Sequence, residues 1–370
     1  MTRIELGIGL LGMLALAAMA CTAADGGADE EQDTDSIDTD STVDAGGDSD
    51  SDADTDADSD GDSDSDSDAD AGIIEMDCSG CPAVGGTMQN MICALDICDE
   101  EVLVSQQYTS PFEFTGCTLE DTYEAVEHFG DVTNGLGAQL NGSYALMATG
   151  PATGTSHSTA CDDYSVVMTD PWTDEEYDIH DVVEWRMILR APDDAEAIRF
   201  RYVFFSEEYD DYISTSYNDR FYAIIESGST NDGNPTIINF TLCREPGEYF
   251  DFICEEDDIA CEEDEVYCYI AINTALSDCC WYNGCPDGYS WDVGTDISGT
   301  GYECSGTTAD SSEYGSSTGW LQTSWPVVGG ETFALTFHIH DTSDGIFDSE
   351  VILDSFVFLE TPEQGTIIVE

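Results

Sequence analysis

The chain has 370 residues, of which 80 are acidic and only 7 are basic, and its formal net charge at pH 7 is -73. All the basic residues are arginines, since the sequence contains no lysine. Nucleic acids and anionic membrane surfaces are excluded as partners, because so acidic a chain cannot neutralise their phosphates. Cations are the partners expected for so acidic a chain, either as a diffuse layer around a salt-adapted surface or as bound divalent ions.

The first 20 residues are predicted to be a signal peptide. Arg3 precedes an apolar stretch, Ile8–Ala18, that is too short to span a bilayer, and Ala18-Met19-Ala20 is a small-x-small cleavage site. Cys21 follows directly and resembles the acylated cysteine of the bacterial lipoprotein lipobox. The alternative is ordinary secretory cleavage that leaves Cys21 unmodified. We expect an exported protein, lipid-anchored at the bacterial outer membrane or cell surface, that contacts the membrane through this lipid only.

The cysteine count favours lipidation of Cys21. The chain has 15 cysteines, and setting Cys21 aside leaves an even number, as a disulfide framework in an oxidising compartment requires. A zinc knuckle is the alternative for the first four of the others, but disulfides are favoured in an exported chain. The cysteines expected to form disulfides are Cys78, Cys81, Cys93, Cys98, Cys117, Cys161, Cys243, Cys254, Cys261, Cys268, Cys279, Cys280, Cys285 and Cys304.

Residues 21–72 are predicted to be a disordered linker. From Asp25 to Asp70 the chain is almost entirely Asp, Ser, Thr, Ala and Gly, so it has too few large apolar residues to build a core. Repulsion between its carboxylates extends it further. Asp56–Gly61 matches the opening of a calcium loop, but a tract this repetitive produces such matches by chance, and Ser67 stands where a bidentate Glu belongs. We interpret the tract as a spacer.

The remainder is predicted to be all-β: a jelly-roll-like β-sandwich with one short helix and a disulfide-rich insertion. Residues 73–118 form its Cys-containing N-terminal segment, and residues 119–370 form the sandwich, with the insertion at 243–304. The helix is expected at Leu119–Phe129, where apolar residues recur on one side. Val351–Leu359 is apolar on both faces, which predicts a central strand. Other strands are expected at Tyr144–Met147, Val182–Leu189, Ile198–Phe205, Phe221–Ile225, Thr236–Leu242 and Phe333–Ile339.

Three segments resemble the choice-of-anchor L domain family of bacterial surface and secreted proteins. Phe204–Tyr212 and the following Asn218–Phe221 look like its central signature, and His340–Asp354 is similar to its closing motif. Phe129–Gly150 resembles its early Gly-rich region. The resemblance covers Phe112–Leu359 and implies an extracellular β-sandwich with no established activity. Family members carry varied C-terminal anchors, and we expect the N-terminal lipid to substitute for one here.

Oxygen-bearing side chains in two of these segments predict a calcium site. Ca²⁺ takes about six to eight oxygens from carboxylates, Asn side chains and loop carbonyls. The predicted ligands are Glu207, Glu208, Asn218, Asp219, Asp341, Asp344, Asp348 and Glu350. The alternative is that they are turn formers and solvated acids of a chain that is acidic everywhere, since Asp344-Gly345 alone is an adequate turn signal.

Two further groups are candidate sites. His338 and His340 share one face of a strand and, with Asp341 alongside, are candidate transition-metal ligands; exposed or hydrogen-bonded histidines are the alternative. Aromatic residues of the insertion are candidates for stacking on sugars or anchoring protein contacts, or else they cover the disulfides. These aromatic residues are Trp281, Tyr282, Tyr289 and Trp291.

The sequence thus predicts a non-enzymatic surface lipoprotein, calcium-stabilised, for adhesion or for binding a glycan or protein. One alternative is a secreted carbohydrate-active hydrolase with carboxylates near Glu207 or Glu208. Adjacent residues on a strand point to opposite faces, so these two cannot themselves form its catalytic pair. The second alternative is a structural envelope component whose acidity serves salt tolerance.

Overall fold

The computed structural model describes residues 72–74, 76–111, 117–152, 168–173, 178–208, 217–242, 267–271, 296–302 and 315–369. The chain divides into two units, Met1–Asp64 and Ser65–Glu370, and every described residue lies in the second. Cys21, the linker and the four candidate aromatic residues of the insertion lie outside the described residues, so the expectations for them stay predictions. Within the described ranges, no helix is both long and apolar enough to cross a membrane.

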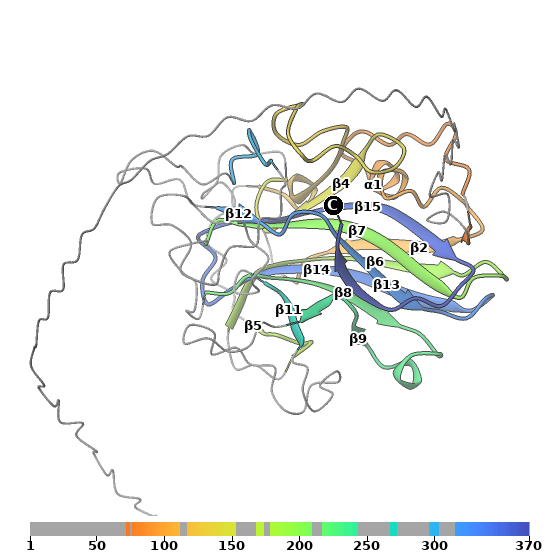
Figure 1. Ribbon diagram of the computed structural model, residues 1–370. Coiled ribbons are helices and arrows are strands. Elements are labelled where there is room, and N and C mark those ends of the chain that lie inside the picture. The colour runs from red at the N-terminus through yellow and green to blue at the C-terminus, as the bar shows by residue number, and fades with distance from the viewer. Residues whose placement is uncertain are drawn as a thin grey trace, which may run out of the picture. The chain divides into compact units, whose positions relative to one another are not determined.

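The described residues form a sandwich of two antiparallel sheets, as the sequence predicts (Figure 1). The first sheet contains β1 (Ile73–Ile74), β3 (Tyr123–Val126), β4 (Tyr144–Ala148), β7 (Ala197–Ser206), β12 (Ser316–Ser317), β13 (Leu321–Pro326), β15 (Ser349–Leu359) and β16 (Gly365–Ile368). The second contains β2 (Leu103–Thr109), β5 (Met168–Thr169), β6 (Asp178–Arg190), β8 (Arg220–Glu226), β9 (Thr236–Ile237), β10 (Phe240–Leu242), β11 (Tyr267–Ala271) and β14 (Thr332–Thr342).

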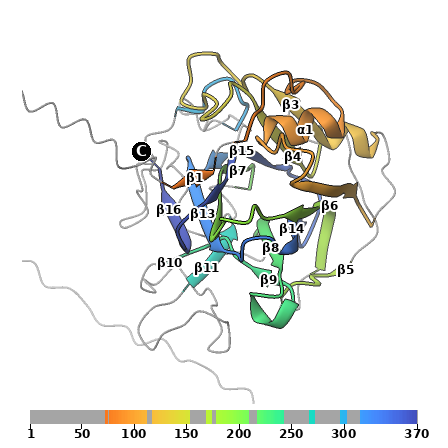
Figure 2. The ribbon, with the colours of Figure 1, turned by 90° about the vertical axis from the view of Figure 1, so that its right-hand side faces the viewer.

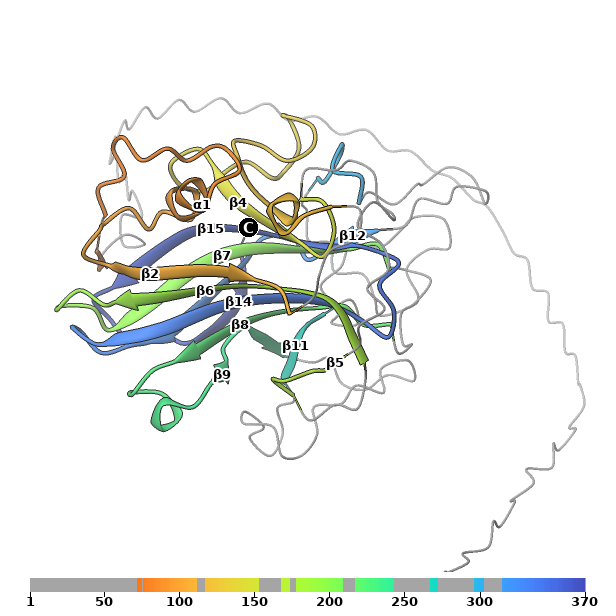
Figure 3. The same ribbon diagram turned by 180° about the vertical axis from the view of Figure 1, so that it is seen from behind.

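Strand order brings segments that are distant in sequence side by side. The main path of the first sheet is β16-β13-β7-β15-β4-β3, with β1 beside β15 and β12 beside β7. The second runs β10-β11-β8-β14-β6-β2, with β5 beside β6 and β9 beside β8. Figure 3 shows β2 along the edge of this sheet, next to β6. Two of the segments that resemble the family are therefore neighbours: the end of β7 lies beside β15 in the first sheet, and the start of β8 lies beside β14 in the second.

The alternation read from the sequence sets the faces of the long strands. The prediction of a central strand at Val351–Leu359 is confirmed, because β15 lies between β7 and β4 and is buried on both sides. Val351 packs in the main core between the sheets, whereas Ile352 packs in a second core on the outer face of the first sheet. Aromatic rings contact one another within the main core, where the ring centroid of Phe337 lies 5.2 Å from that of Phe200.

The prediction of a helix at Leu119–Phe129 is wrong. A single 3₁₀ turn, η1 (Leu119–Thr122), leads directly into β3 (Tyr123–Val126). In β3, every second residue is buried, and Tyr123 pairs with Met147 of β4. Over so short a segment, pairing with the sheet outweighs the weak intrinsic preference for helix.

The one α-helix among the described residues, α1 (Met88–Ala94), lies instead in the N-terminal Cys-containing segment. It begins at a capping box formed by Thr87 and Asn90, and it packs on β3 and β4 (Figure 2). Two disulfides, Cys78–Cys98 and Cys81–Cys93, hold the segment around it, so a zinc knuckle is excluded there. Cys117 is disulfide-bonded as well.

Candidate functional site

Acidic side chains gather at one end of the sandwich, where four strands meet. Because the strands are antiparallel, the end of β7 lies beside the start of β15, with Ser206 opposite Ser349. In the second sheet the end of β14 lies beside the start of β8, with His340 opposite Arg220. The predicted calcium ligands follow or precede these strand ends, so the fold brings most of them to the same end.

Asp219 lies at the centre of this arrangement, fully buried between the sheets. Its carboxylate accepts hydrogen bonds from the Ser206 hydroxyl at 3.1 Å, the Ser349 hydroxyl at 2.6 Å and the Thr342 backbone N–H at 3.1 Å. Burial raises the pKa of Asp219 to about 6, and these hydrogen bonds, which favour the ionised form, oppose the rise. Asp219 therefore connects β7, β14 and β15 through one carboxylate.

Glu208 and Asp341 flank Asp219 and are almost completely buried, with 2% and 1% of their surface exposed. Burial, followed by the charge of Asp219, raises the pKa of Glu208 to about 11. The same two causes raise the pKa of Asp341 well above its usual range, and nearby Thr149 lowers it only in part. Glu208 Oε2 and both carboxyl oxygens of Asp341 lack a hydrogen bond of normal geometry. We call Glu208, Asp219 and Asp341 the inter-sheet carboxyl cluster.

Glu350 is not in this cluster. Its neighbour Val351 faces the main core, so Glu350 points to the opposite side of the first sheet, where Tyr302 of the second core hydrogen-bonds it. Burial and then the charge of Asp348 raise its pKa well above the usual range. The eight predicted ligands therefore do not form one group, because adjacent strand residues face opposite ways.

The other predicted ligands lie around the cluster. Glu207 is buried, with its N–H donating to the Asp348 carbonyl at 3.4 Å, and the Asn218 carbonyl accepts from the Thr342 hydroxyl at 2.9 Å. Asp344 is half-buried in the turn between β14 and β15. Asp348 packs so closely on Gly150 that a Cβ there would overlap its carboxylate.

The sequence analysis missed Asp181, which is 4% exposed and contributes to the raised pKa of Asp341. It lies within β6 with a left-handed backbone, φ 46°, and its carboxylate occupies the space that a side chain at position 345 would need. The sequence feature that could have indicated Asp181 is its position directly before the apolar pair Val182-Val183 of β6.

The inter-sheet carboxyl cluster has the oxygen atoms that a cation site needs, but they are not arranged around one position. Oxygens from carboxylates are the donors that Ca²⁺ prefers. In the part of the chain that the structure describes, however, no three or more His, Cys, Asp or Glu side chains are placed to hold one metal ion. Sharing one ion would therefore require these side chains to rearrange. In the described arrangement the charges of Glu208 and Asp341 are neutralised by protons, since an isolated buried carboxylate is strongly disfavoured.

The cluster is poorly arranged for glycoside hydrolysis. The two acids of a glycosidase flank the sugar bond at about 5 to 9.5 Å from each other. Glu208 and Asp219 hydrogen-bond one another instead, and at most 2% of either is exposed. A sugar has no access to this pair.

His338 and His340 are fully buried on the outer face of the second sheet. His338 Nε2 lies 2.9 Å from His340 Nδ1, and His338 Nδ1 lies 3.0 Å from a carboxylate oxygen of Glu184. Burial, followed by the charge of His338, lowers the pKa of His340 well below its usual range. Both nitrogens of His338 have partners, so the described geometry is that of hydrogen-bonded histidines.

Residues 192–359 match the sequence model of the family described as Choice-of-anchor L domain. This part of the chain is therefore similar to a choice-of-anchor L domain. It includes β7, β8, β14 and β15, and therefore the whole inter-sheet carboxyl cluster, whereas α1 and β6 precede it.

This match indicates an exported or surface-associated bacterial protein. No curated protein and no solved structure matches the chain.

Proposed function

We propose that the protein is a bacterial surface lipoprotein, anchored through an acylated Cys21 at the outer membrane or cell surface. The choice-of-anchor L domain supports a surface location, and the cleavage-site pattern and odd cysteine count support the lipid. The acidic linker then acts as a spacer that presents the sandwich to the surroundings. The domain serves in adhesion by binding a glycan or a protein, without catalysing a reaction.

The second part of the proposal is that Ca²⁺ stabilises the domain by binding at the inter-sheet carboxyl cluster. Its main support is Asp341, which is 1% exposed and has neither carboxyl oxygen in a hydrogen bond of normal geometry. Leaving a buried polar group unpaired costs about 1–3 kcal/mol, and more when it is charged. A cation between Asp341, Glu208 and Asp219 would remove this penalty and join strand ends from both sheets.

The test is the melting temperature of the full chain, with disulfides intact, in EDTA and then across added Ca²⁺. Mg²⁺ at the same ionic strength controls for general screening of the acidic surface. A site filled at 100 times its dissociation constant adds about 2.7 kcal/mol, or about 5 to 10 °C for a domain of this size. Asp341→Asn should abolish the shift, whereas Asp194→Asn, at an exposed position, should keep it.

An equal response to Mg²⁺ and Ca²⁺, or a shift that Asp341→Asn retains, would contradict the calcium proposal and leave the cluster as a group of protonated acids.

The lipid is tested separately, because Cys21→Ala should move the protein from the detergent phase to the aqueous phase of a two-phase extraction. The adhesion proposal is tested by probing a glycan array with the protein, with and without Ca²⁺. If the protein binds none of the glycans saturably, the ligand is expected to be a protein.

A further inference from the structure

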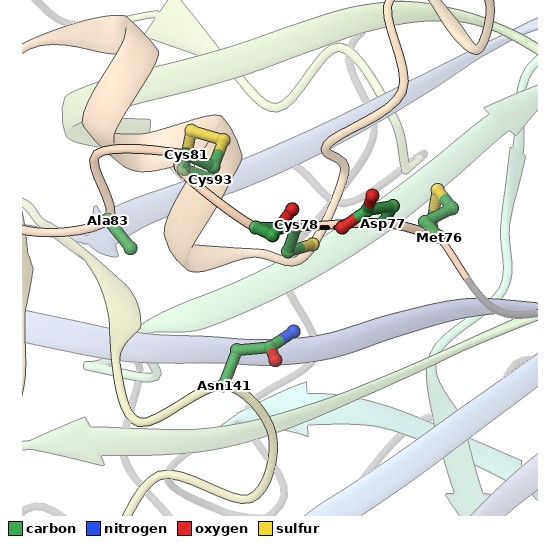
Figure 4. Close-up of a pocket in the computed structure, with 8 residues that line it drawn as sticks. Met76, Asp77, Cys78, Cys81, Ala83, Cys93 and Asn141 are labelled. Carbon is green, nitrogen blue, oxygen red and sulfur yellow. Dashed lines mark hydrogen bonds between the residues drawn. A yellow bond between two sulfur atoms is a disulfide. The ribbon is translucent and has the colours of Figure 1, made fainter.

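Away from the carboxyl cluster, the N-terminal segment leaves a hollow against the first sheet. One cavity of about 580 Å³ lies beside the disulfides and is lined by Met76, Cys78 and Asn141 among others (Figure 4). A second cavity of about 430 Å³ shares these three residues and extends toward β15. Because they share a wall, the two cavities adjoin, and each has the size of a small-molecule site.

One buried carboxyl group lines the second cavity, and a second one hydrogen-bonds it from behind. Asp96 lines it and is 2% exposed, and Asp354 behind it is fully buried. Asp96 accepts hydrogen bonds from the Asn141 side chain at 2.7 Å and the Ser355 N–H at 3.1 Å. Asp354 accepts from the Gln139 N–H at 2.6 Å. The two carboxyl groups also hydrogen-bond each other, so their positions are fixed in advance.

The backbone around this pair is held in a disfavoured conformation. Asp96, Asn141 and Ser355 all adopt left-handed geometry, with φ values of 71°, 50° and 57°. Asp and Asn adopt this geometry more readily than other residues, whereas for Ser355 it costs about 1–3 kcal/mol. The three residues converge here, together with an irregularity in the pairing of β15 with β7 between Asp354 and Val357.

Apart from Asp96, Asn141 and Cys78, the wall of the second cavity is apolar. The apolar part is formed by Ile73, Met76, Leu140, Phe356 and Val357. Leu140 is 39% exposed, so apolar surface reaches solvent.

The charge of the hollow is negative at both ends. Asp77, on the outer cavity, is exposed, and its hydrogen bonds with Ser79 lower its pKa. No arginine occurs among the described residues that line either cavity. The acidic linker of this chain is a poor occupant, because it carries the same sign of charge. The matching ligand has a cationic head and an apolar body.

We propose that this hollow binds a small organic ammonium ion, whose head group is held by Asp96 with Asp354 behind it and whose apolar part contacts Phe356 and Met76. The site is independent of the calcium proposal, since it lies on different residues and needs no metal. The carboxyl pair supplies orientation and charge, and the apolar wall selects ammonium ions with a hydrocarbon portion over inorganic cations.

Binding at this site should release a proton. Burial raises the pKa of Asp96 to about 6 and that of Asp354 to about 7, with Asp96 adding to the rise at Asp354. The pair therefore retains a proton near neutral pH and titrates as a unit. An ammonium ion stabilises the doubly ionised pair and displaces that proton. An ammonium ion that binds nonspecifically to the acidic surface would release no proton.

The test is calorimetric titration of the full chain, with disulfides intact, in EDTA and about 0.15 M salt to screen the net charge. The probes are 2-phenylethylammonium, its neutral analogue 2-phenylethanol and the anion phenylacetate. We expect the ammonium ion to bind at least about tenfold more tightly than the alcohol, and the anion not to bind. Runs at pH 6.5 in two buffers of different ionisation enthalpy should report about one proton released per ligand bound.

Two variants test the location. Asp96→Asn should weaken 2-phenylethylammonium binding about 10- to 100-fold, as expected for a charged hydrogen-bond partner. Leu140→Trp should also weaken it by filling the rim without touching either carboxyl group. Glu100→Gln, at an exposed position outside the hollow, should bind as the unaltered chain does. The proposal is overturned if the ammonium ion binds more weakly than about 10 mM, if the alcohol binds equally well, or if both pocket variants keep full affinity.

Discussion

Asp354→Asn should stabilise the folded chain at pH 8 and destabilise it at pH 4. Asp354 is fully buried, and burial raises its pKa from 3.8 to about 7. Because this pKa is higher in the folded than in the unfolded state, the folded chain binds more protons between these two values. Stability is therefore lost as the pH rises through that range.

The size of the effect follows from the pKa shift. About three pKa units at 1.36 kcal/mol each correspond to about 4 kcal/mol of lost stability above pH 7, and to almost none below pH 4. This is an upper bound, because Asp96 shares the proton. Asparagine has one acceptor oxygen for the Gln139 N–H and the Ser355 hydroxyl, so one hydrogen bond worth about 1 kcal/mol is lost at every pH.

The net expectation is about 1 kcal/mol of destabilisation at pH 4 and up to about 3 kcal/mol of stabilisation at pH 8. At about 2 to 4 °C per kcal/mol, both changes are measurable as shifts in melting temperature. The assay is thermal unfolding followed by circular dichroism in EDTA from pH 4 to pH 8, with Glu100→Gln as the exposed control. If the difference between Asp354→Asn and the unaltered chain stays constant across this range, Asp354 does not titrate as a buried acid and the reasoning fails.

Three further predictions concern packing and covalent constraint, and thermal or urea unfolding tests each. Replacing both cysteines of the Cys81–Cys93 disulfide by serine opens a loop of sequence separation 12 and should cost about 3 kcal/mol; an unchanged melting temperature would mean the bridge adds no constraint. Phe337→Ala should cost about 3–5 kcal/mol, because the ring is fully buried between the sheets, and a loss below 1 kcal/mol would contradict this placement. Gly150→Ala should cost about 1–3 kcal/mol through overlap with the Asp348 carboxylate, whereas Gly137→Ala, with open space around it, should be nearly neutral; equal effects would argue against that contact.

The sequence alone was enough to place the long strands and the class of fold. Alternation of apolar residues located β7 and β14, and a continuous apolar run located β15 as a central strand. These patterns work because side-chain direction in a strand depends only on local backbone geometry. The same rule would have separated Glu350 from the inter-sheet carboxyl cluster, since Val351 next to it belongs to the main core.

Contacts between distant segments were decided only by the tertiary structure. The Leu119–Phe129 pattern fits a helix in isolation, and pairing with β4 made part of it a strand. The Asp96 carboxylate meets the backbone of Ser355 across a separation of 259 residues, and no local pattern in either segment indicates the other. Burial and the raised pKa values follow from such meetings, because desolvation depends on everything that packs around a group. Composition and periodicity therefore determined where the strands run and which way their residues face, whereas only the packing of the two sheets and the N-terminal segment decided which acids are buried together.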